Sequence, residues 1–304
     1  MAIAIISHPD CLLHAIEGHP EQPDRVSRIQ AALKESPCLA SLQFLDAPLA
    51  TREELIRAHQ EDYVDWIAQI APQNNFLAID ADTIMNPYTL QAAKRAAGAL
   101  IMAVDLVVPK KMDRAFCNVR PPGHHAEFNK AMGFCFFNNV AVGVHHALAQ
   151  YGFQRIAIID FDVHHGNGTQ NIFQNDERVL YCSSFQHPFY PGYDASLDNS
   201  HILSVPLAEN TEGLAFRERV AAAWFNPLAT FKPEIIFISA GFDAHRDDPL
   251  ASLKLEKEDY VWITKELLAI AKTHSEGRII SALEGGYHLP ALAECAVAHV
   301  CALV

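Results

Sequence analysis

The sequence predicts an α/β domain in which a mainly parallel β-sheet is covered by helices on both faces. Short apolar runs, typical of buried parallel strands, alternate along the chain with longer segments of helical periodicity. The chain has 304 residues, 50% of them hydrophobic and 19% charged, which is enough to bury one large core. No Gly/Ser linker, low-complexity tract or internal repeat divides it. We therefore expect a single domain over residues 1–304.

The individual elements follow from these patterns in order. The expected strands cover residues 1–6, 114–119, 155–161, 179–184, 202–206, 234–240 and 278–283. The expected helices cover residues 23–35, 62–70, 88–107, 138–150, 169–174, 214–231, 257–273 and 289–302. Pro23 lies at a suitable first-turn position, where its missing N–H is not needed. Thr51 and Glu54 form a capping-box pattern, which predicts a further short helix from residue 51.

Charge, hydropathy and cysteine usage narrow the environment. The formal net charge of −13 disfavours direct nucleic-acid binding and weakly favours cationic ligands such as lysine-rich tails or polyamines. No apolar run approaches the roughly 18 residues of a membrane span, and the first residues lack the basic flank of a signal peptide. The seven cysteines have irregular spacing and no C-x-x-C pair, which predicts reduced thiols and a cytoplasmic location.

The segment 160–169 is the most informative part of the chain. It follows Ile156-Ala157-Ile158-Ile159, a run typical of a buried strand. Since side chains alternate along a strand, Asp160, Asp162 and His164 are expected on one face at its end. Two carboxylates and one imidazole are ligands for a divalent metal, most commonly zinc. The plain alternative is a polar strand end that caps the next helix, although unpaired polar groups would be costly there.

Three further strand ends carry polar or glycine-rich sequence. A Pro-Pro-Gly turn presents His124 and His125, and neutral imidazole is a natural general base near pH 7. Asp243 follows the strand at 234–240, and a Gly-Gly turn before Tyr287 follows the strand at 278–283. Taken singly, each has a structural alternative. The histidines could be hydrogen-bonded loop residues, Asp243 could be a helix N-cap, and Tyr287 could be an aromatic side chain packed on a helix. Because ligands bind at the carboxyl ends of parallel strands, the four ends together predict one site.

At this point the chain resembles a known family. The Pro-Pro-Gly-His-His and Asp-x-Asp-x-His-His-Gly-x-Gly-Thr motifs are intact, and the similarity extends from the segment 19–25 to the segment 284–287. On these motifs the chain resembles the histone deacetylase superfamily, most closely its class II and bacterial histone deacetylase-like amidohydrolase branch. The resemblance implies a three-layer α/β/α arginase/deacetylase fold. It also implies one zinc-dependent domain over residues 1–304 that hydrolyses linear amides.

The resemblance assigns roles residue by residue. Asp162, His164 and Asp243 match the zinc ligands, and the hydroxyl of Tyr287 matches the donor to the developing oxyanion. His125 matches the general base. The partners expected around this base are His124 as its electrostatic neighbour, Asp160 orienting His124, and Asn167 orienting His125. The class I branch usually has aspartate at the last position, so a neutral asparagine should leave the proton affinity of His125 lower.

Further residues are placed by the same resemblance. A narrow tunnel would be lined by Gly133, Phe134, Phe189 and Tyr190, whose aromatic walls suit an aliphatic lysine stem. A potassium ion would lie by Asp160, Ser183 and Ser184, and a second by Phe173, Asp176 and Val179. Arg25 matches an arginine at the floor, where acetate leaves; a helix-surface salt bridge is the equal alternative.

The substrate is the least determined feature. We expect deacetylation or deacylation of lysine side chains in proteins or peptides, with Leu250 at the tunnel mouth offering no charge for a distal ammonium group. The alternative is an acetylpolyamine amidohydrolase, or a deacetylase of another small N-acetylated amine. Negative charge near the rim from Asp194, Asp247 and Asp248 would favour this alternative. A non-catalytic acetyl-lysine reader is disfavoured by the intact histidine pair and Tyr287. The oligomeric state is left open.

Overall fold

The computed structural model describes residues 2–304 and contains one eight-stranded parallel sheet. The strand order is β2-β1-β5-β10-β9-β6-β7-β8. The strands are β1 (Ile3–Ser7), β2 (Leu42–Asp46), β5 (Arg114–Cys117), β6 (Ile156–Asp160), β7 (Val179–Gln186), β8 (Ile202–Leu207), β9 (Ile235–Ala240) and β10 (Ile279–Leu283). Every neighbouring pair is parallel, which confirms the predicted class. Met1, expected within the first strand, lies outside the described residues.

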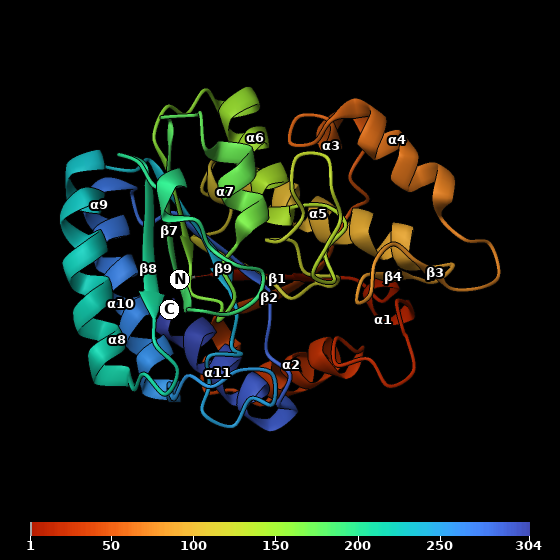
Figure 1. Cartoon of the computed structure of the whole chain (residues 1–304). Coiled ribbons are helices and arrows are strands. Elements are labelled where there is room, and N and C mark those ends of the chain that lie inside the picture. Colours follow the sequence, from red (N-terminus) through yellow and green to blue (C-terminus); the bar gives the residue numbers. More distant parts are fainter. Residues whose placement is uncertain (1) are drawn as a thin grey trace.

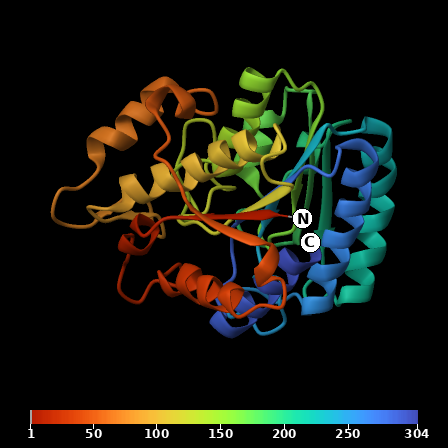
Figure 2. The ribbon, with the colours of Figure 1, turned by 180° about the vertical axis from the view of Figure 1, so that it is seen from behind.

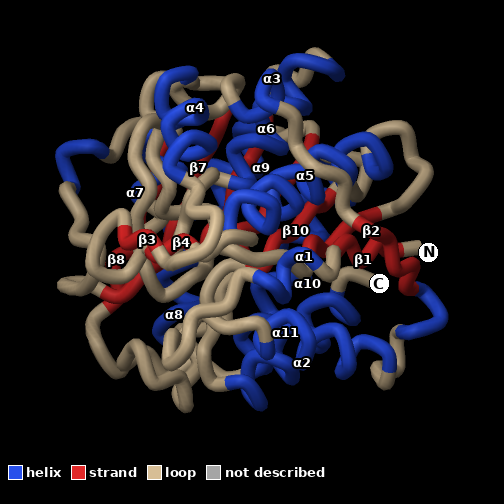
Figure 3. The backbone as a smooth tube through the Cα atoms, turned by 90° about the vertical axis from the view of Figure 1, so that its right-hand side faces the viewer, coloured by secondary structure: helices blue, strands red, loops and turns tan. Residues whose placement is uncertain are grey.

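Helices cover both faces of this sheet, as the band of strands between helices in Figure 3 shows. On one face lie α4 (Glu61–Ile70), α5 (Thr89–Val107), α6 (Asn139–Tyr151) and α7 (Asn167–Phe173). On the other face lie α2 (Asp24–Lys34), α8 (Gly213–Val220), α9 (Asn226–Phe231), α10 (Lys257–His274) and α11 (Leu289–Ala302). Strand β1 shows the cause: Ala4 and Ile6 join the first core, and Ile3 and Ile5 join the second.

Several elements differ from those expected. Strand β2 was not predicted, because it is short, lies at the sheet edge and shows no buried face. A small antiparallel hairpin, β3 (Leu77–Ala78) with β4 (Ile84–Met85), was also missed, as was α1 (Asp10–Leu13). The long helix expected over 214–231 is divided into α8, a π-helical turn (Ala221–Phe225) and α9, near Pro227, which cannot donate a backbone hydrogen bond. The capping box at Thr51 is confirmed and opens α3 (Arg52–Leu55).

The prediction that all seven cysteines are reduced is wrong. Cys38 and Cys301 form a disulfide, although 263 residues separate them in the sequence. Helices α2 and α11 pack side by side, and Figures 1 and 2 show them in the lower layer of the molecule. Cys38 lies shortly after the end of α2, and Cys301 lies in the last turn of α11. Spacing along the chain cannot reveal a pair that tertiary packing brings together. The other five cysteines are buried free thiols.

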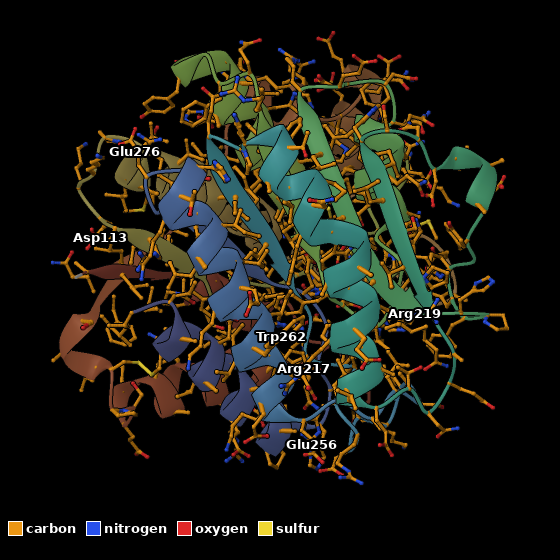
Figure 4. The ribbon with its side chains drawn as sticks, turned by 90° about the vertical axis from the view of Figure 1, so that its left-hand side faces the viewer. Asp113, Arg217, Arg219, Glu256, Trp262 and Glu276 are labelled. Atoms are coloured by element: carbon orange, nitrogen blue, oxygen red, sulfur yellow. A yellow bond between two sulfur atoms is a disulfide. The ribbon has the colours of Figure 1, made fainter. Side chains whose placement is uncertain are left out.

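The surface behind the sheet is formed by α8 and α10, which run side by side in Figure 4. Arg217 of α8 places its guanidinium 5.7 Å from the ring centroid of Trp262 on α10 and donates to Asp259. Among residues 2–304, no helix is long and apolar enough to cross a membrane.

Candidate metal and catalytic site

The site lies where four adjacent parallel strands end. Strands β5, β10, β9 and β6 are neighbours in the sheet, so the segments that follow them meet at one edge. These segments, together with the loop after β7 and part of the β3–β4 hairpin region, enclose a cavity of about 230 Å³. The residues that line it are Asp82, Pro122, His124, His125, Gly133, Phe134, His164, Phe189, Tyr190, Leu250, Gly285 and Tyr287. The structure therefore brings the four motifs together, as their strand-end positions predicted.

Asp162, His164 and Asp243 form a compact cluster beside this cavity. Their ligand atoms all lie within 4.8 Å of one another, and both carboxylates are buried. Nδ1 of His164 is 3.1 Å from Oδ1 of Asp162 and 3.2 Å from Oδ2 of Asp243. That Oδ2 atom makes no aligned hydrogen bond. A buried oxygen without a donor, beside a second carboxylate, fits a cation as its partner.

The protonation equilibria of the cluster support the same conclusion. Burial and the neighbouring charge of Asp162 raise the pKa of Asp243 to about 7. Burial opposes a charged His164, but its contacts with Asp162 and Asp243 raise the pKa of His164 to about 10. The two carboxylates thus attract positive charge strongly. A divalent metal would supply that charge while taking the imidazole in its neutral form.

Two glycines allow the carboxylates to pack this closely. A Cβ atom on Gly241 would lie 2.0 Å from Oδ2 of Asp162, and one on Gly285 would lie 2.0 Å from Oδ2 of Asp243. The backbone N–H of Gly285 also donates to Oδ2 of Asp162, at 2.7 Å. Any side chain at either glycine would displace the cluster.

Asp160 lies apart from the triad, although strand alternation grouped it with Asp162 and His164. Its Oδ2 atom is 3.0 Å from Nδ1 of His124 and accepts a hydrogen bond from the hydroxyl of Tyr181. The third residue of the cluster is instead Asp243, in the segment that follows the neighbouring strand β9. Alternation identifies which side chains share a face, but not which atoms converge.

The two adjacent histidines have different partners and opposite pKa shifts. Nδ1 of His125 lies 2.8 Å from Oδ1 of Asn167, a neutral amide. Burial disfavours charge on His124, yet Asp162 and Asp160 hold its pKa well above the ordinary value. Burial and the nearby charge of His124 hold the pKa of His125 well below it. His124 is therefore the charged imidazole of the pair and His125 the neutral one.

Tyr287 is held at the cavity by contacts on three sides. It is only 9% exposed, and its backbone N–H donates to Oδ2 of Asp248 at 2.7 Å. The guanidinium of Arg25 lies 4.9 Å from the centroid of its ring, and Phe134 meets it edge-on at 6.0 Å. Burial raises the pKa of the phenol well above its ordinary value, so the hydroxyl stays protonated as a donor.

Arg25 is fully buried, which rules out the alternative of a helix-surface salt bridge. Its guanidinium donates to Glu21 at 2.9 Å and to the carbonyl oxygens of Gly286, at 2.7 Å, and Glu284. It therefore fixes the turn that carries Tyr287. Its suggested part in acetate release stays a prediction.

The predicted tunnel residues line the cavity together. The ring of Phe189 stacks on His164 at 5.4 Å, and the ring of Tyr190 meets His125 edge-on at 5.3 Å. Gly133 and Phe134 both have positive φ angles, of 57° and 69°. A Cβ atom on Gly133 would lie 2.5 Å from the ring of His125, so this wall packs directly on the histidine.

The residues expected around potassium lie outside this cavity. Ser183 pairs in register with Asp160 across β6 and β7, and Ser184 follows it; both are buried. Phe173 and Val179 are also buried, whereas Asp176 binds the side chain of Arg178. The two potassium sites stay predictions.

For three acidic residues near the site, the sequence predicted either no role or a different position. Glu284 is buried, accepts from the backbone N–H groups of Gly123 and His124, and has a pKa raised to about 7, chiefly by burial. Its position at the end of a core strand was the available signal. Asp248 was expected near the rim but is 6% exposed and binds backbone instead. Asp82 lines the cavity from the hairpin region that was not predicted.

Comparisons with known proteins agree with this geometry. A family model described as the histone deacetylase domain matches residues 19–303. A histone deacetylase-like amidohydrolase of Pseudomonas aeruginosa is 35% identical over 280 residues, which cover 90% of this chain and 73% of that protein. A probable deacetylase of Archaeoglobus fulgidus is 36% identical over 296 residues, which cover 94% and 82%.

The solved structures give the same answer. The crystal structure of the HDA15 HD domain superposes with a TM-score of 0.91 at 31% sequence identity, over 99% of this chain and 88% of that one. By this fold, these relatives and the triad of Asp162, His164 and Asp243, the chain belongs to the histone deacetylase family of deacetylases and amidohydrolases.

Proposed function

We propose that this protein is a zinc-dependent amidohydrolase that removes acetyl or related acyl groups from lysine side chains of proteins or peptides. The observation that carries the proposal is the cavity itself. Its aromatic walls lead to the triad, whose His164 lines the cavity together with the neutral His125 and the protonated Tyr287. Such a passage suits an extended aliphatic stem that ends in an amide.

Zinc bound by Asp162, His164 and Asp243 would polarise the amide carbonyl and acidify water. The residues of the chain then divide the remaining work. His125, neutral and bonded through Nδ1 to Asn167, presents Nε2 to accept a proton from the attacking water and later to return it to the leaving amine. The charged His124 stabilises negative charge that develops nearby.

Tyr287 completes this arrangement as a hydrogen-bond donor. Its hydroxyl remains protonated and would donate to the carbonyl oxygen as that atom becomes anionic. The Asp248 carboxylate and the Arg25 guanidinium hold the backbone and the ring of this residue in place. The donor is thus positioned before the substrate arrives.

Leu250 supports an acyl-lysine substrate over an acetylpolyamine. It lines the cavity and offers no charge to a distal ammonium group. Asp82, however, also lines the cavity and is a carboxylate, which favours acetylpolyamine hydrolysis as the second candidate. Burial and the neighbouring Asp80 raise the pKa of Asp82, which opposes its charged form.

The two candidates are separated by substrate selectivity. The measurement is kcat/KM of the zinc-loaded enzyme for an acetyl-lysine peptide, acetylputrescine and acetylspermidine. We expect the peptide to be preferred, and Leu250→Glu to move selectivity several-fold toward the polyamines, since an exposed charge pair contributes about 1 kcal/mol. Preference of the parent for acetylspermidine, abolished by Asp82→Asn, would instead establish the second candidate.

A further inference from the structure

The side chain of Asn167 lies between His125 and a second acidic residue, Glu127. Oδ1 of Asn167 is 2.8 Å from Nδ1 of His125. Nδ2 of the same amide donates to Oε1 of Glu127 at 2.8 Å, and Sδ of Met132 lies 3.3 Å from that nitrogen. The three side chains therefore form a continuous chain of hydrogen bonds, from the imidazole through the amide to a carboxylate.

These hydrogen bonds determine which ring nitrogen of His125 carries its proton. A carboxylate only accepts, so Glu127 requires the NH₂ end of the amide to face it. The carbonyl end then faces Nδ1 of His125 and requires a proton there. Nε2 is left with its lone pair. With the amide turned over, its NH₂ group would face Nδ1, and the neutral imidazole would carry its proton on Nε2, where it cannot act as a base.

An aspartate at position 167 would need no such control, because both ends of a carboxylate accept. An asparagine presents two different ends of nearly equal shape. Met132 favours the observed orientation only weakly, since a thioether sulfur is a poor acceptor. Of the contacts made by this amide nitrogen, only that with Glu127 is strong enough to decide the orientation.

The backbone of Glu127 is fixed from both sides. Its carbonyl accepts from Nδ1 of the buried His59 at 2.9 Å, and Nε2 of His59 accepts from the backbone of Asn138. The preceding residues pack directly on α7, where a Cβ atom on Gly168 would lie 2.3 Å from the carbonyl oxygen of Ala126. This fixed backbone therefore holds the carboxylate of Glu127 beside Asn167.

We propose that Glu127 is a positioning residue that orients the Asn167 amide and thereby sets the tautomer of His125. This inference deepens the proposed function, in which His125 is the base. Glu127 acts through Asn167 and needs no contact with the substrate.

The tautomer can be observed directly and without turnover. Zinc-loaded protein labelled with ¹⁵N-histidine gives distinct signals for the protonated and unprotonated ring nitrogens, and His125→Ala identifies those of His125. We expect the proton on Nδ1 in the parent and in Glu127→Gln, whose side-chain oxygen can still accept. Glu127→Leu should move the proton wholly or partly to Nε2. An unchanged pattern in Glu127→Leu would overturn the proposal, whatever the enzyme hydrolyses.

Kinetics provide a second, independent test with an acetyl-lysine peptide. Glu127→Leu should lower kcat about tenfold to a hundredfold, the range for loss of an orienting partner, with little change in KM and full zinc content. Glu127→Gln should retain most of the rate. Glu218→Leu, a matched change at an exposed glutamate of α8, should have no effect.

The Asn167→Asp background separates orientation from loop packing. There Glu127 faces a second carboxylate, so Glu127→Leu should leave kcat unchanged or raise it. If Glu127→Leu lowers kcat equally in both backgrounds, the glutamate only supports the loop and the proposal fails. Absence of any amide hydrolysis by the parent would overturn the proposed function, while the tautomer measurement would still decide the role of Glu127.

Discussion

Neighbouring residues in this site differ because of a few atoms around each one. His124 and His125 are adjacent and equally buried, yet one faces the carboxylate of Asp160 and the other the amide of Asn167. The carboxylate raises the pKa of His124. The neutral amide does not offset the effect of burial, so the pKa of His125 is lowered. One buried histidine pair thereby combines an imidazole of raised pKa with one of lowered pKa, and the proposed function uses the second as the base.

Removing the Tyr287 hydroxyl should affect the rate far more than binding. Tyr287→Phe keeps the ring that contacts Arg25 and Phe134 but loses the donor. We expect kcat to fall by about two to three orders of magnitude, the usual effect of losing one oxyanion donor, with KM and zinc content little changed. Steady-state kinetics and metal analysis test this; a near-normal kcat would show that the hydroxyl does not act in the transition state.

A buried histidine outside the triad predicts loss of stability in acid. His299 lies between Thr264 and Ser281, and burial lowers its pKa from 6.5 to about 3. Below pH 6.5 the unfolded chain therefore takes up a proton that the folded protein excludes. The contribution of the neutral His299 to the unfolding free energy is present in full above pH 6.5 and is lost as the pH falls below that value.

His299→Gln removes this titration, so the unfolding free energies of the parent and the variant can be compared at two pH values. At pH 7 the parent should be the more stable protein, because the substitution disturbs two buried hydrogen bonds. At pH 5 the difference in unfolding free energy should be smaller by roughly 2 kcal/mol. Urea denaturation at both pH values measures this, and an equal difference at pH 7 and pH 5 would contradict it.

At the scale of elements, the central strands were predictable and the edges of the molecule were not. Apolar runs of four residues, at 156–159 and 235–238, identify β6 and β9, because a strand buried on both faces needs no alternation. Strand β2 is partly exposed and its pairing partner, β1, lies more than thirty residues away, so neither composition nor alternation identified it. The β3–β4 hairpin has two residues per strand, too few for a periodic signal.

The turn between β10 and α11 depends on one buried carboxylate. Oδ2 of Asp248 accepts from the backbone of Tyr287 at 2.7 Å and lies 3.3 Å from that of His288, and Oδ1 accepts from Leu250. Asp248→Ala would leave the buried N–H of Tyr287 unpaired, at a cost of about 1–3 kcal/mol in unfolding free energy.

The same substitution should also loosen Tyr287. We expect kcat to fall about tenfold or more, as for other lost orienting partners, while zinc stays bound. Asp247→Ala is the matched control, since this neighbouring side chain is 57% exposed and lies 3.8 Å from His245. Equal effects of the two substitutions on kcat would show that Asp248 has no special part in positioning the tyrosine.

For the whole molecule, the disulfide joins the segments near both ends of the chain. The Cys38–Cys301 bond closes a loop of most of the residues, so its loss should lower the unfolding free energy by about 2–4 kcal/mol. Denaturation with and without dithiothreitol measures this, and Cys38→Ala/Cys301→Ala should be insensitive to the reductant. A thiol assay on unfolded, unreduced protein should detect the five other cysteines; seven reactive thiols would contradict the bond.

The site as a whole was predictable to the extent that strand ends determine it. Polar residues after four strands identified the triad residues, the histidine pair and Tyr287, since a parallel sheet gathers such residues at one edge. Supporting residues such as Asp248 and Glu127 could not be placed, because their roles depend on contacts between segments far apart in sequence. The disulfide was unpredictable for the same reason.

The most direct test of the account is acetate release from an acetyl-lysine peptide by metal-stripped protein before and after addition of zinc. We predict no turnover without metal and full recovery at one zinc per chain, with Asp243→Ala neither binding zinc nor recovering, because the triad provides the metal site. Acetate release at the parent rate by the stripped protein, or by Asp243→Ala, would contradict the central claim.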